Sequence, residues 1–389
     1  MSREQVRTEV AVIGAGIIGV SAAFFLRELG RDVVLVERGG IGEESSGKNA
    51  GSMPLQVKKG PLIALCRGGI MTWREMDQDF GGLGFVQSGG LRVAETRQEL
   101  ETLRQQADAR NKLGADISIL TKQETRSIAP YLSTAIHGVA YCPWDSHCDA
   151  LTGTQSIARA AMQRGVEIVE HSPVMRLEQT TTGHVNVITE KTLFRCNKVL
   201  LAAGAWTRQL ALSLAVDIPT DIWIKQMLVT ARSERIIKHM LTHTRGNLTL
   251  KQVECGSVLI GGGWIGDEAR GISRTRFSSI LGNVQLAARI VPDLKRLEIV
   301  RTWVGTDCRT SDGLPIIGSL SGKEGVYVAV ACVGGYAAGP YVGKLVAQTM
   351  SNGISEQPLE PFSLSRFHVN GCSRVKPARK PRPAEKKSA

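Results

Sequence analysis

The most restrictive feature of this sequence is a glycine motif between two apolar segments. Residues 9–13 are apolar after Glu9, Gly14–Gly19 read G-A-G-I-I-G, and residues 20–29 are typical of a helix. Residues 32–36 are apolar after Asp32, and Glu37 follows them. Strand, glycine turn, helix and strand in this order are typical of a dinucleotide-binding unit, in which an acid follows the first glycine by about 20 residues. Glu37 follows Gly14 by 23 residues. The pattern therefore predicts an α/β, Rossmann-like domain.

Each part of the motif has a task in holding a dinucleotide. The first glycine permits the tight turn, the second lets a pyrophosphate approach the backbone, and the third lets the helix pack on the strand. The helix start offers free N–H groups and a partial positive charge to the phosphates. The acid accepts hydrogen bonds from the ribose and would repel a 2′-phosphate. A glycine turn without a ligand is the alternative. We expect cofactor contacts from Gly14, Gly16, Ile17, Ile18, Gly19, Glu37 and Arg38.

The segment after this unit distinguishes FAD from NAD. An NAD domain would normally continue with another helix–strand unit, whereas residues 42–52 form a loop of small residues that can run beside a longer cofactor. This loop resembles that of the D-amino acid oxidase-like flavoproteins, which include glycine oxidase, sarcosine oxidase and D-amino acid dehydrogenase. In that family, a loop ending in Ala-Gly passes the diphosphate and the flavin. The corresponding positions here are Ser45, Ser46, Asn49, Ala50, Gly51 and Ser52.

The resemblance extends along most of the chain. A helix predicted over 149–165 matches one that returns to the nucleotide-binding sheet, and Val174 stands where the family holds adenine through the backbone. Residues 198–207 resemble an apolar strand that ends in Ala-Gly-Ala-Trp, which implies that Gly204 and Trp206 lie beside the cofactor.

A second glycine cluster opens a predicted helix near the C-terminus, at Gly334, Gly335 and Tyr336. In the family, this helix directs its N-terminus at the pyrimidine side of the isoalloxazine. Free N–H groups there would stabilise the negative charge of reduced flavin near N1 and the C2 carbonyl oxygen. Tight packing alone is the alternative for these glycines.

The matching segments imply a discontinuous fold. A Rossmann-like FAD-binding domain is expected to be interrupted by a mixed-sheet, α+β substrate domain. The expected FAD-binding segments are 1–55, 141–215 and 300–365, and the expected substrate segments are 56–140 and 216–299. Residues 366–389 hold eight basic residues against one acid, so this tail carries +7 of the net charge of +12. We expect a disordered basic tail, and the mildly basic remainder gives no argument for binding nucleic acid.

The resemblance implies oxidation of a carbon–nitrogen bond, with a hydride passing to flavin N5. In the family, an Arg in the run WxGxRPxTPDGxPxIG orients the substrate carboxylate. Residues 303–318 resemble that run, but Asp307 replaces this Arg and Cys308 replaces the proline. Asp307 either faces a cationic substrate group or forms an internal salt bridge with Arg301 or Arg309. The candidate substrate contacts are Arg301, Arg309, Asp307, Lys251 and Gln252, with Lys225 as a further candidate for the carboxylate.

Two departures separate the chain from sarcosine oxidases. Leu259 stands where those chains place a lysine above the flavin, and Thr306 stands near the position of the cysteine that binds flavin covalently. The resemblance therefore implies noncovalent FAD and favours a dehydrogenase. The segments 48–52 and 248–263 resemble catalytic β-subunits of heteromeric proline, hydroxyproline and opine dehydrogenases. Such proteins work beside an electron-accepting, α-type partner, sometimes with FMN at the interface.

The remaining features narrow the setting. The eight cysteines include no CxxC pair, so neither a metal nor an iron–sulfur site is expected. The polar N-terminus does not resemble a secretory signal, and no apolar stretch is long enough for a membrane span. A cytoplasmic location, or one peripheral to the membrane, is the expectation. His147 precedes the helix predicted from Asp149 and is interpreted as structural.

We therefore expect FAD-dependent oxidation of the C–N bond of an amino acid or N-substituted amino acid, of the D-amino acid, proline/hydroxyproline or opine type. The chain would act as the catalytic subunit of a dehydrogenase complex. The alternatives are a free-standing oxidase that produces peroxide, a non-catalytic flavin-binding subunit, and a hydroxy-acid oxidase, because a fold does not fix a substrate.

Overall fold

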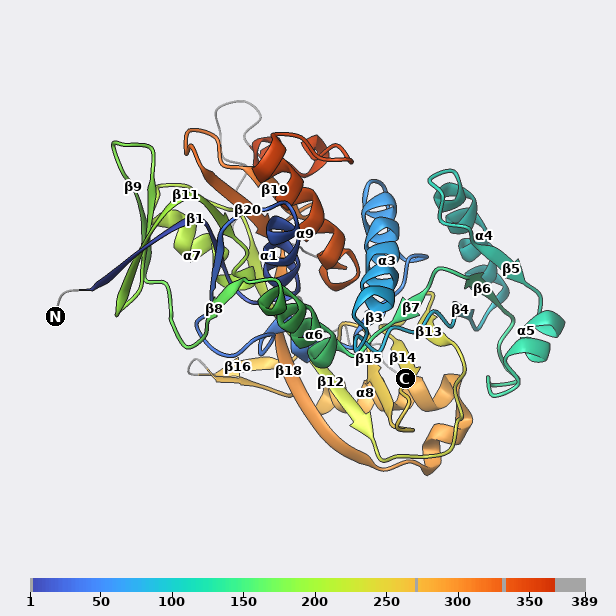
Figure 1. Ribbon diagram of the computed structural model, residues 1–389. Helices are drawn as coiled ribbons and strands as arrows, with labels where there is room; N and C mark the ends of the chain where they lie inside the picture. Colours follow the sequence, from blue (N-terminus) through green and yellow to red (C-terminus); the bar gives the residue numbers. More distant parts are fainter. Residues whose placement is uncertain (1–2, 270–271, 331–333, 368–389) are drawn as a thin grey trace.

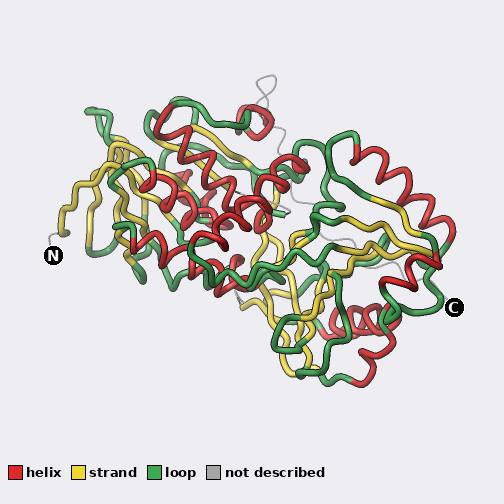
Figure 2. The backbone as a smooth tube through the Cα atoms, turned by 45° about the vertical axis from the view of Figure 1, so that its right-hand side comes forward, coloured by secondary structure: helices red, strands yellow, loops and turns green. Residues whose placement is uncertain are grey.

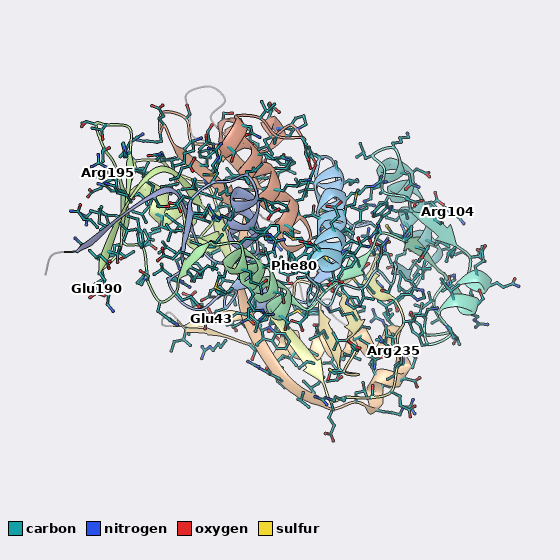
Figure 3. The ribbon with its side chains drawn as sticks, viewed as in Figure 1. Glu43, Phe80, Arg104, Glu190, Arg195 and Arg235 are labelled. Atoms are coloured by element: carbon teal, nitrogen blue, oxygen red, sulfur yellow. The ribbon has the colours of Figure 1, made fainter. Side chains whose placement is uncertain are left out.

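A computed structural model of the 389-residue chain describes residues 3–269, 272–330 and 334–367. The described chain forms two lobes, each built around an eight-stranded sheet (Figures 1 and 2). Arg195 and Glu190 mark the outer end of the first lobe, and Arg104 marks the opposite end of the molecule (Figure 3). The expected α/β class with mixed sheets is confirmed.

The first sheet contains the predicted dinucleotide-binding unit. Its order is β19 (Ile316–Ser319), β20 (Val326–Val330), β11 (Thr192–Leu201), β1 (Glu4–Ile13), β2 (Val33–Val36) and β8 (Glu167–Val169), with β10 (Val185–Ile188) and β9 (Arg176–Gln179) continuing from β11. The strands from β20 to β8 run parallel, whereas β19 pairs antiparallel with β20. Every residue of β2 is buried, which is typical of a strand covered on both faces.

Three helices cover one face of this sheet (Figure 1): α1 (Ile17–Glu28), α6 (Ala150–Gln163) and α9 (Gly335–Asn352). The predicted helix over 149–165 is confirmed as α6, with the Asp149 carboxylate accepting from the Thr152 N–H (2.8 Å) as its N-cap. Helices α1 and α9 approach closely, because a Cβ at Gly339 would lie 2.7 Å from Ile17 and one at Gly343 would lie 2.6 Å from Ser21. These contacts hold the beginnings of both helices near the same edge of the sheet.

The second sheet has the order β18 (Ile299–Arg309), β12 (Asp221–Thr230), β15 (Val258–Gly261), β14 (Thr249–Gln252), β13 (Met240–His243), β4 (Gly90–Ala94), β6 (Gly138–Cys142) and β5 (Ser118–Leu120). The helices of this lobe are α4 (Arg97–Asn111), α5 (Lys122–Ile128) and α8 (Phe277–Ile290), and α3 (Leu62–Asp79) packs against α9. The sheet draws strands from both expected insertions. It also includes β18, which the expected division placed in the FAD-binding domain, because β18 pairs with β12 along nearly its whole length.

Short elements connect the lobes. Strand β3 (Ser52–Met53) pairs with β7 (Ser146–His147), and α2 (Ser45–Lys48) lies in the loop of small residues. The remaining α-helix is α7 (Thr207–Leu212), and the remaining strands, β16 (Asp267–Ala269) and β17 (Ile272–Arg274), pair antiparallel. No helix in the described ranges is both long and apolar enough to cross a membrane. The basic tail, from 368 onward, lies outside the described residues.

Candidate active site

The glycine turn between β1 and α1 is closed by backbone contacts. Gly14 has φ +103°, and a Cβ there would lie 2.7 Å from the Ala202 carbonyl oxygen. A Cβ at Gly19 would overlap the Gly14 carbonyl, so the start of α1 lies directly against the turn. The first N–H groups of α1 have no partner within the helix and face the edge where parallel strands end. This is the geometry of a dinucleotide diphosphate site.

Glu37 is fixed at the end of β2 by two backbone donors. Its carboxylate accepts from the Ala15 N–H (2.7 Å) and from the Gly39 N–H (2.8 Å). The acid therefore stands beside the glycine turn, where an adenosine ribose would follow the diphosphate. Arg38 points elsewhere: its guanidinium stacks 3.4 Å from the Trp206 ring centroid and pairs with Glu44 at 2.8 Å. Arg38 and Trp206, which are both predicted to contact the cofactor, therefore contact each other.

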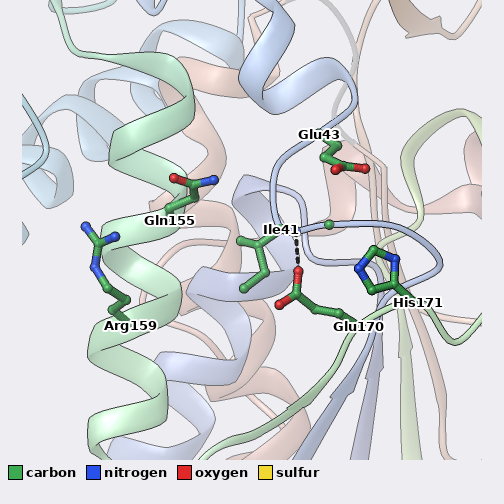
Figure 4. Close-up of a pocket in the computed structure, with 7 residues that line it drawn as sticks. Ile41, Glu43, Gln155, Arg159, Glu170 and His171 are labelled. Atoms are coloured by element: carbon green, nitrogen blue, oxygen red, sulfur yellow. Dashed lines mark hydrogen bonds between the residues drawn. The ribbon is translucent and has the colours of Figure 1, made fainter.

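A pocket lies near Glu37, between α6 and the ends of β2 and β8 (Figure 4). Its side chains include Ile41, Glu43, Arg159 and Glu170, and the Glu170 carboxylate accepts from the Ile41 N–H at 2.9 Å. The pocket is polar and suits the adenosine end of a long cofactor.

Two further predicted cofactor contacts belong to the first lobe. Val174 is half-buried and packs against the apolar cluster on the other side of the first sheet. Gly204 has φ +52°, with no atom within 4 Å of a Cβ built on it. The backbone at Gly204 is therefore open to a ligand.

The loop of small residues is ordered by its own hydrogen bonds. The Ser46 hydroxyl accepts from the Ile17 N–H (2.9 Å) at the start of α1. The Asn49 side chain donates to the Ser45 and Ser46 carbonyls and accepts from the Gly51 N–H (2.6 Å). We call residues 45–52 the cofactor loop. It begins at the glycine turn of the first lobe and ends at the second sheet.

Two observations on this loop fit a bound FAD. The Ser52 hydroxyl is buried without a hydrogen-bond partner among the described residues, and a buried polar group normally has one. A Cβ at Gly16 would lie only 3.1 Å from the Ser46 hydroxyl, so glycine at this position lets the loop approach the start of α1, where a diphosphate would lie. The residues present therefore suit a dinucleotide with a flavin extending along the loop.

The N-terminus of α9 reaches the same region. Gly334 caps the helix with φ +92°, and the Tyr336 hydroxyl donates to the Ala150 carbonyl at 2.8 Å. The Trp73 indole N–H donates to the Tyr336 carbonyl, and the two rings lie 5.2 Å apart. These contacts hold helix α9 against α3 and α6. The direction of its first N–H groups is therefore fixed.

Strand register decides which side chains of the second sheet face the cofactor loop. Directly paired residues share a face, and the pairs here are Lys225 with Gly305, Val229 with Leu259, and Lys251 with Leu259. A Cβ at Gly305 would lie 2.9 Å from Lys48 Cβ, and Lys251 Nζ lies 3.2 Å from a Cβ built at Gly51. This face therefore lies against the cofactor loop, and we call it the substrate face. It carries Lys251, Lys225, Trp223, Arg301, Asp307 and Arg309.

Two basic side chains of the substrate face, those of Arg309 and Lys225, lie around one aromatic ring. Arg309 Cζ lies 4.5 Å and Lys225 Nζ 4.7 Å from the Trp223 ring centroid, both within cation–π range. Asp307 pairs with Arg309 (3.2 Å), which is the internal salt bridge expected as one alternative for this acid. Burial lowers the pKa of Lys225 to about 8, so this lysine still carries charge at neutral pH. Two cations face one acid here, which leaves a net positive site.

Lys251 lies deepest on the substrate face. Only 2% of it is exposed, and its ammonium donates to the Cys148 carbonyl at 2.8 Å. Burial lowers its pKa to about 8. Among the described residues, the ammonium has no carboxylate within ion-pair distance. A buried cation without a carboxylate partner favours an anionic ligand close to it.

Three other residues considered in the sequence analysis are not placed to bind a substrate carboxylate beside Trp223. Gln252 neighbours Lys251 on the opposite face, and its amide bonds the backbone at Ile236, Ile237 and Glu234, which is a structural role. Arg301 shares the substrate face but is exposed, with its Cζ 5.9 Å from the Trp303 ring centroid. His147 is buried, and burial together with Lys251 and Arg235 lowers its pKa to about 3, so its imidazole is neutral.

Three side chains at the site were not singled out from the sequence. Trp223 is one aromatic residue among several in alternating strands, and only its pairing with β18 gathers cations around it. Asp145 is buried and accepts from the Leu55 and Gln56 N–H groups, which fixes the segment after the cofactor loop. Lys58 lies buried beside Gly334. No cluster of three or more metal-ligating side chains exists among the described residues.

Comparisons with known proteins agree with this geometry. The family model "FAD dependent oxidoreductase" (DAO) matches residues 9–349. The chain is 27% identical over 372 residues to glycine oxidase of Geobacillus kaustophilus, covering 92% of this chain and 97% of that protein. It is 26% identical to an opine oxidase subunit of Agrobacterium tumefaciens, over 93% and 98% of the two chains. The structure of L-proline dehydrogenase from P. horikoshii aligns with a TM-score of 0.86 at 25% identity, over 94% and 98% of the chains.

Proposed function

Because this chain belongs to the DAO family of FAD-dependent oxidoreductases and is an FAD-dependent enzyme, we propose that it oxidises the C–N bond of an amino acid or N-substituted amino acid. The observation that carries this proposal is the substrate face. Its basic side chains lie opposite the cofactor loop, so an anionic substrate bound there would be held against the flavin. When bound, FAD supplies the hydride acceptor.

The chain's own residues then have distinct roles. Glu37, the glycine turn and the start of α1 hold the adenosine and diphosphate, and the loop from Ser45 to Ser52 holds the flavin portion. Arg309 and Lys225 bind the substrate carboxylate on either side of Trp223, in place of the arginine that Asp307 replaces. Asp307 is then placed to attract the cationic part of the substrate. Orientation of this kind accounts for much of the catalytic effect when a cofactor performs the chemistry.

We further propose that the chain is the catalytic subunit of a dehydrogenase complex acting on a D-amino acid, a proline or hydroxyproline, or an opine. Support comes from the similarity to the Agrobacterium opine oxidase protein and to the beta chain of sarcosine oxidase from Rhizobium meliloti, both of which are named as subunits. Leu259, which lies on the substrate face, also agrees, because the family resemblance aligns it with a lysine of the sarcosine oxidases. We also propose that the chain assembles with an α-type partner subunit and that an FMN binds at their interface.

The experiment is a turnover assay with the purified chain. D-amino acids, L-proline, hydroxyprolines, sarcosine and opines are each supplied with an artificial electron acceptor and, separately, with oxygen. The proposal predicts that at least one of these amines turns over with the acceptor much faster than with oxygen. Stoichiometric peroxide at a comparable rate would contradict the dehydrogenase part and support a free-standing oxidase, which the similarity to glycine oxidase favours.

A further inference from the structure

Lys58 is a buried lysine just beyond the cofactor loop. Only 6% of it is exposed, and its backbone is fixed on both sides. Its N–H donates to the Leu55 carbonyl (2.9 Å), and its carbonyl accepts from Arg110 Nε (2.9 Å). The segment before it is held by Asp145 through the Leu55 and Gln56 N–H groups. The position of this lysine is therefore set by the fold.

The Lys58 ammonium lies against the beginning of α9. A Cβ built on Gly334 would overlap Lys58 Nζ, and Cε would lie 2.9 Å away. Gly334 is the N-cap of this 18-residue helix, whose first N–H groups carry a partial positive charge. A buried side-chain cation and the positive end of a long helix thus meet at one point.

Nothing in the described chain neutralises this point. The Lys58 ammonium has no hydrogen-bond or ion-pair partner within residues 3–269, 272–330 and 334–367. Cys66 lies nearby, with its thiol 4.0 Å from the Gly334 carbonyl, and burial raises its pKa, so it stays neutral. The oxygens of Asp145 accept from three donors of Leu55 and Gln56, and Arg110 adds further positive charge. An unpaired buried cation is costly unless a ligand supplies the counter-charge.

The family resemblance already places the N-terminus of α9 at the pyrimidine edge of the flavin; we propose that Lys58 adds a buried side-chain cation to this edge and raises the cofactor's reduction potential. The inference rests on the proposed function, which places the flavin along the loop that leads to Lys58. Reduced flavin carries negative charge near N1 and the C2 carbonyl oxygen, so a fixed cation there favours the reduced form. Lys58 would then be a cofactor-tuning residue, and Gly334 would be glycine partly because a side chain would displace the ammonium.

The test measures the midpoint potential of the bound FAD in the full chain, by anaerobic reduction against a reference dye. Lys58→Met removes the charge, Lys58→Arg keeps it, and Lys59→Met removes the charge of the exposed neighbour. We expect Lys58→Met to shift the equilibrium at least tenfold toward oxidised FAD, which is a potential lower by about 30 mV for two electrons. Lys58→Arg and Lys59→Met should stay within about threefold of wild type.

The outcomes separate this inference from the proposed function. If the Lys58→Met variant binds FAD with the wild-type midpoint potential, the proposed role of Lys58 is wrong. The proposed oxidation of a C–N bond would not be affected by that result. A wild-type chain that takes up no FAD would overturn the function itself. A folded Lys58→Met without FAD, beside a Lys58→Arg that retains it, would support the charge requirement. Loss of FAD from both variants would show that the charge is not what the cofactor needs.

Discussion

The glycine turn of the first lobe and the substrate face of the second sheet meet at one loop, but they use different parts of the chain. The turn depends on backbone geometry: Gly14 and Gly19 are needed because a Cβ would overlap carbonyl groups, and we propose that the start of α1 binds the diphosphate. The substrate face presents side chains from three strands, namely Lys225, Lys251 and Arg309, which we propose as the groups that hold the substrate. A backbone site leaves a short, fixed motif in the sequence, whereas a side-chain site is dispersed and changes with the substrate.

The largest effect is expected in the turn. Gly14→Ala adds a Cβ within 2.7 Å of the Ala202 carbonyl oxygen at φ +103°, so we expect FAD content to fall below about a tenth of wild type. Gly322→Ala is the matched control, because Gly322 also has a positive φ (+73°) but no atom near the added Cβ. The readout is the ratio of flavin to protein absorbance. Equal FAD loss in both variants would mean that backbone strain, not the close approach at the turn, is responsible.

The next largest effect is expected from a substitution on the substrate face. Arg309→Met removes a charge-assisted contact worth about 1.5–3 kcal/mol and leaves Asp307 unpaired. We therefore expect KM for an amino-acid substrate to rise roughly 10- to 100-fold with FAD content unchanged. Arg301→Met, on the same strand face but exposed, should change KM by less than about twofold. Steady-state kinetics of the pair decide which arginine binds the carboxylate, and a larger effect from Arg301 would reassign the site.

The two regions also differ in how far the sequence predicts them. The spacing from Gly14 to Glu37 predicts the turn, and Asp149 predicts the start of α6, because both depend on local backbone geometry. The pairing of β18 with β12 was not predictable, since it joins residues about 80 positions apart in the chain. The cation group around Trp223, and the orientation of Gln252 away from the loop, follow only from that register.

A smaller effect is the pH dependence that Lys251 gives to the stability of the fold. Burial lowers its folded pKa to about 8, so between pH 8 and about 10.5 the unfolded chain binds more protons than the folded chain. Stability contributed at this site must therefore rise with pH in that window. Relative to Lys251→Met, the wild type should gain on the order of 2 kcal/mol between pH 8 and pH 10, measured by urea unfolding. A difference that does not change with pH would mean that this ammonium is not desolvated.

The smallest effect is expected outside both regions. Truncation after Arg374 removes most of the basic tail, which lies beyond the described residues. FAD content and KM should stay within about twofold of wild type, because the residues that form the turn and the substrate face all precede the cut. Flavin absorbance after purification checks this expectation, and loss of the cofactor would show that the tail contributes to the fold.

The most direct test of the proposed chemistry is anaerobic bleaching of the bound FAD. The FAD-loaded chain is mixed with each substrate of the panel without oxygen or an added acceptor, and the flavin absorbance is followed. We expect complete bleaching by at least one amino acid or N-substituted amino acid, at about one substrate per chain, with Arg309→Met requiring a higher concentration. A flavin that stays oxidised with every amine, or that is bleached only by a hydroxy acid, would contradict oxidation of a C–N bond.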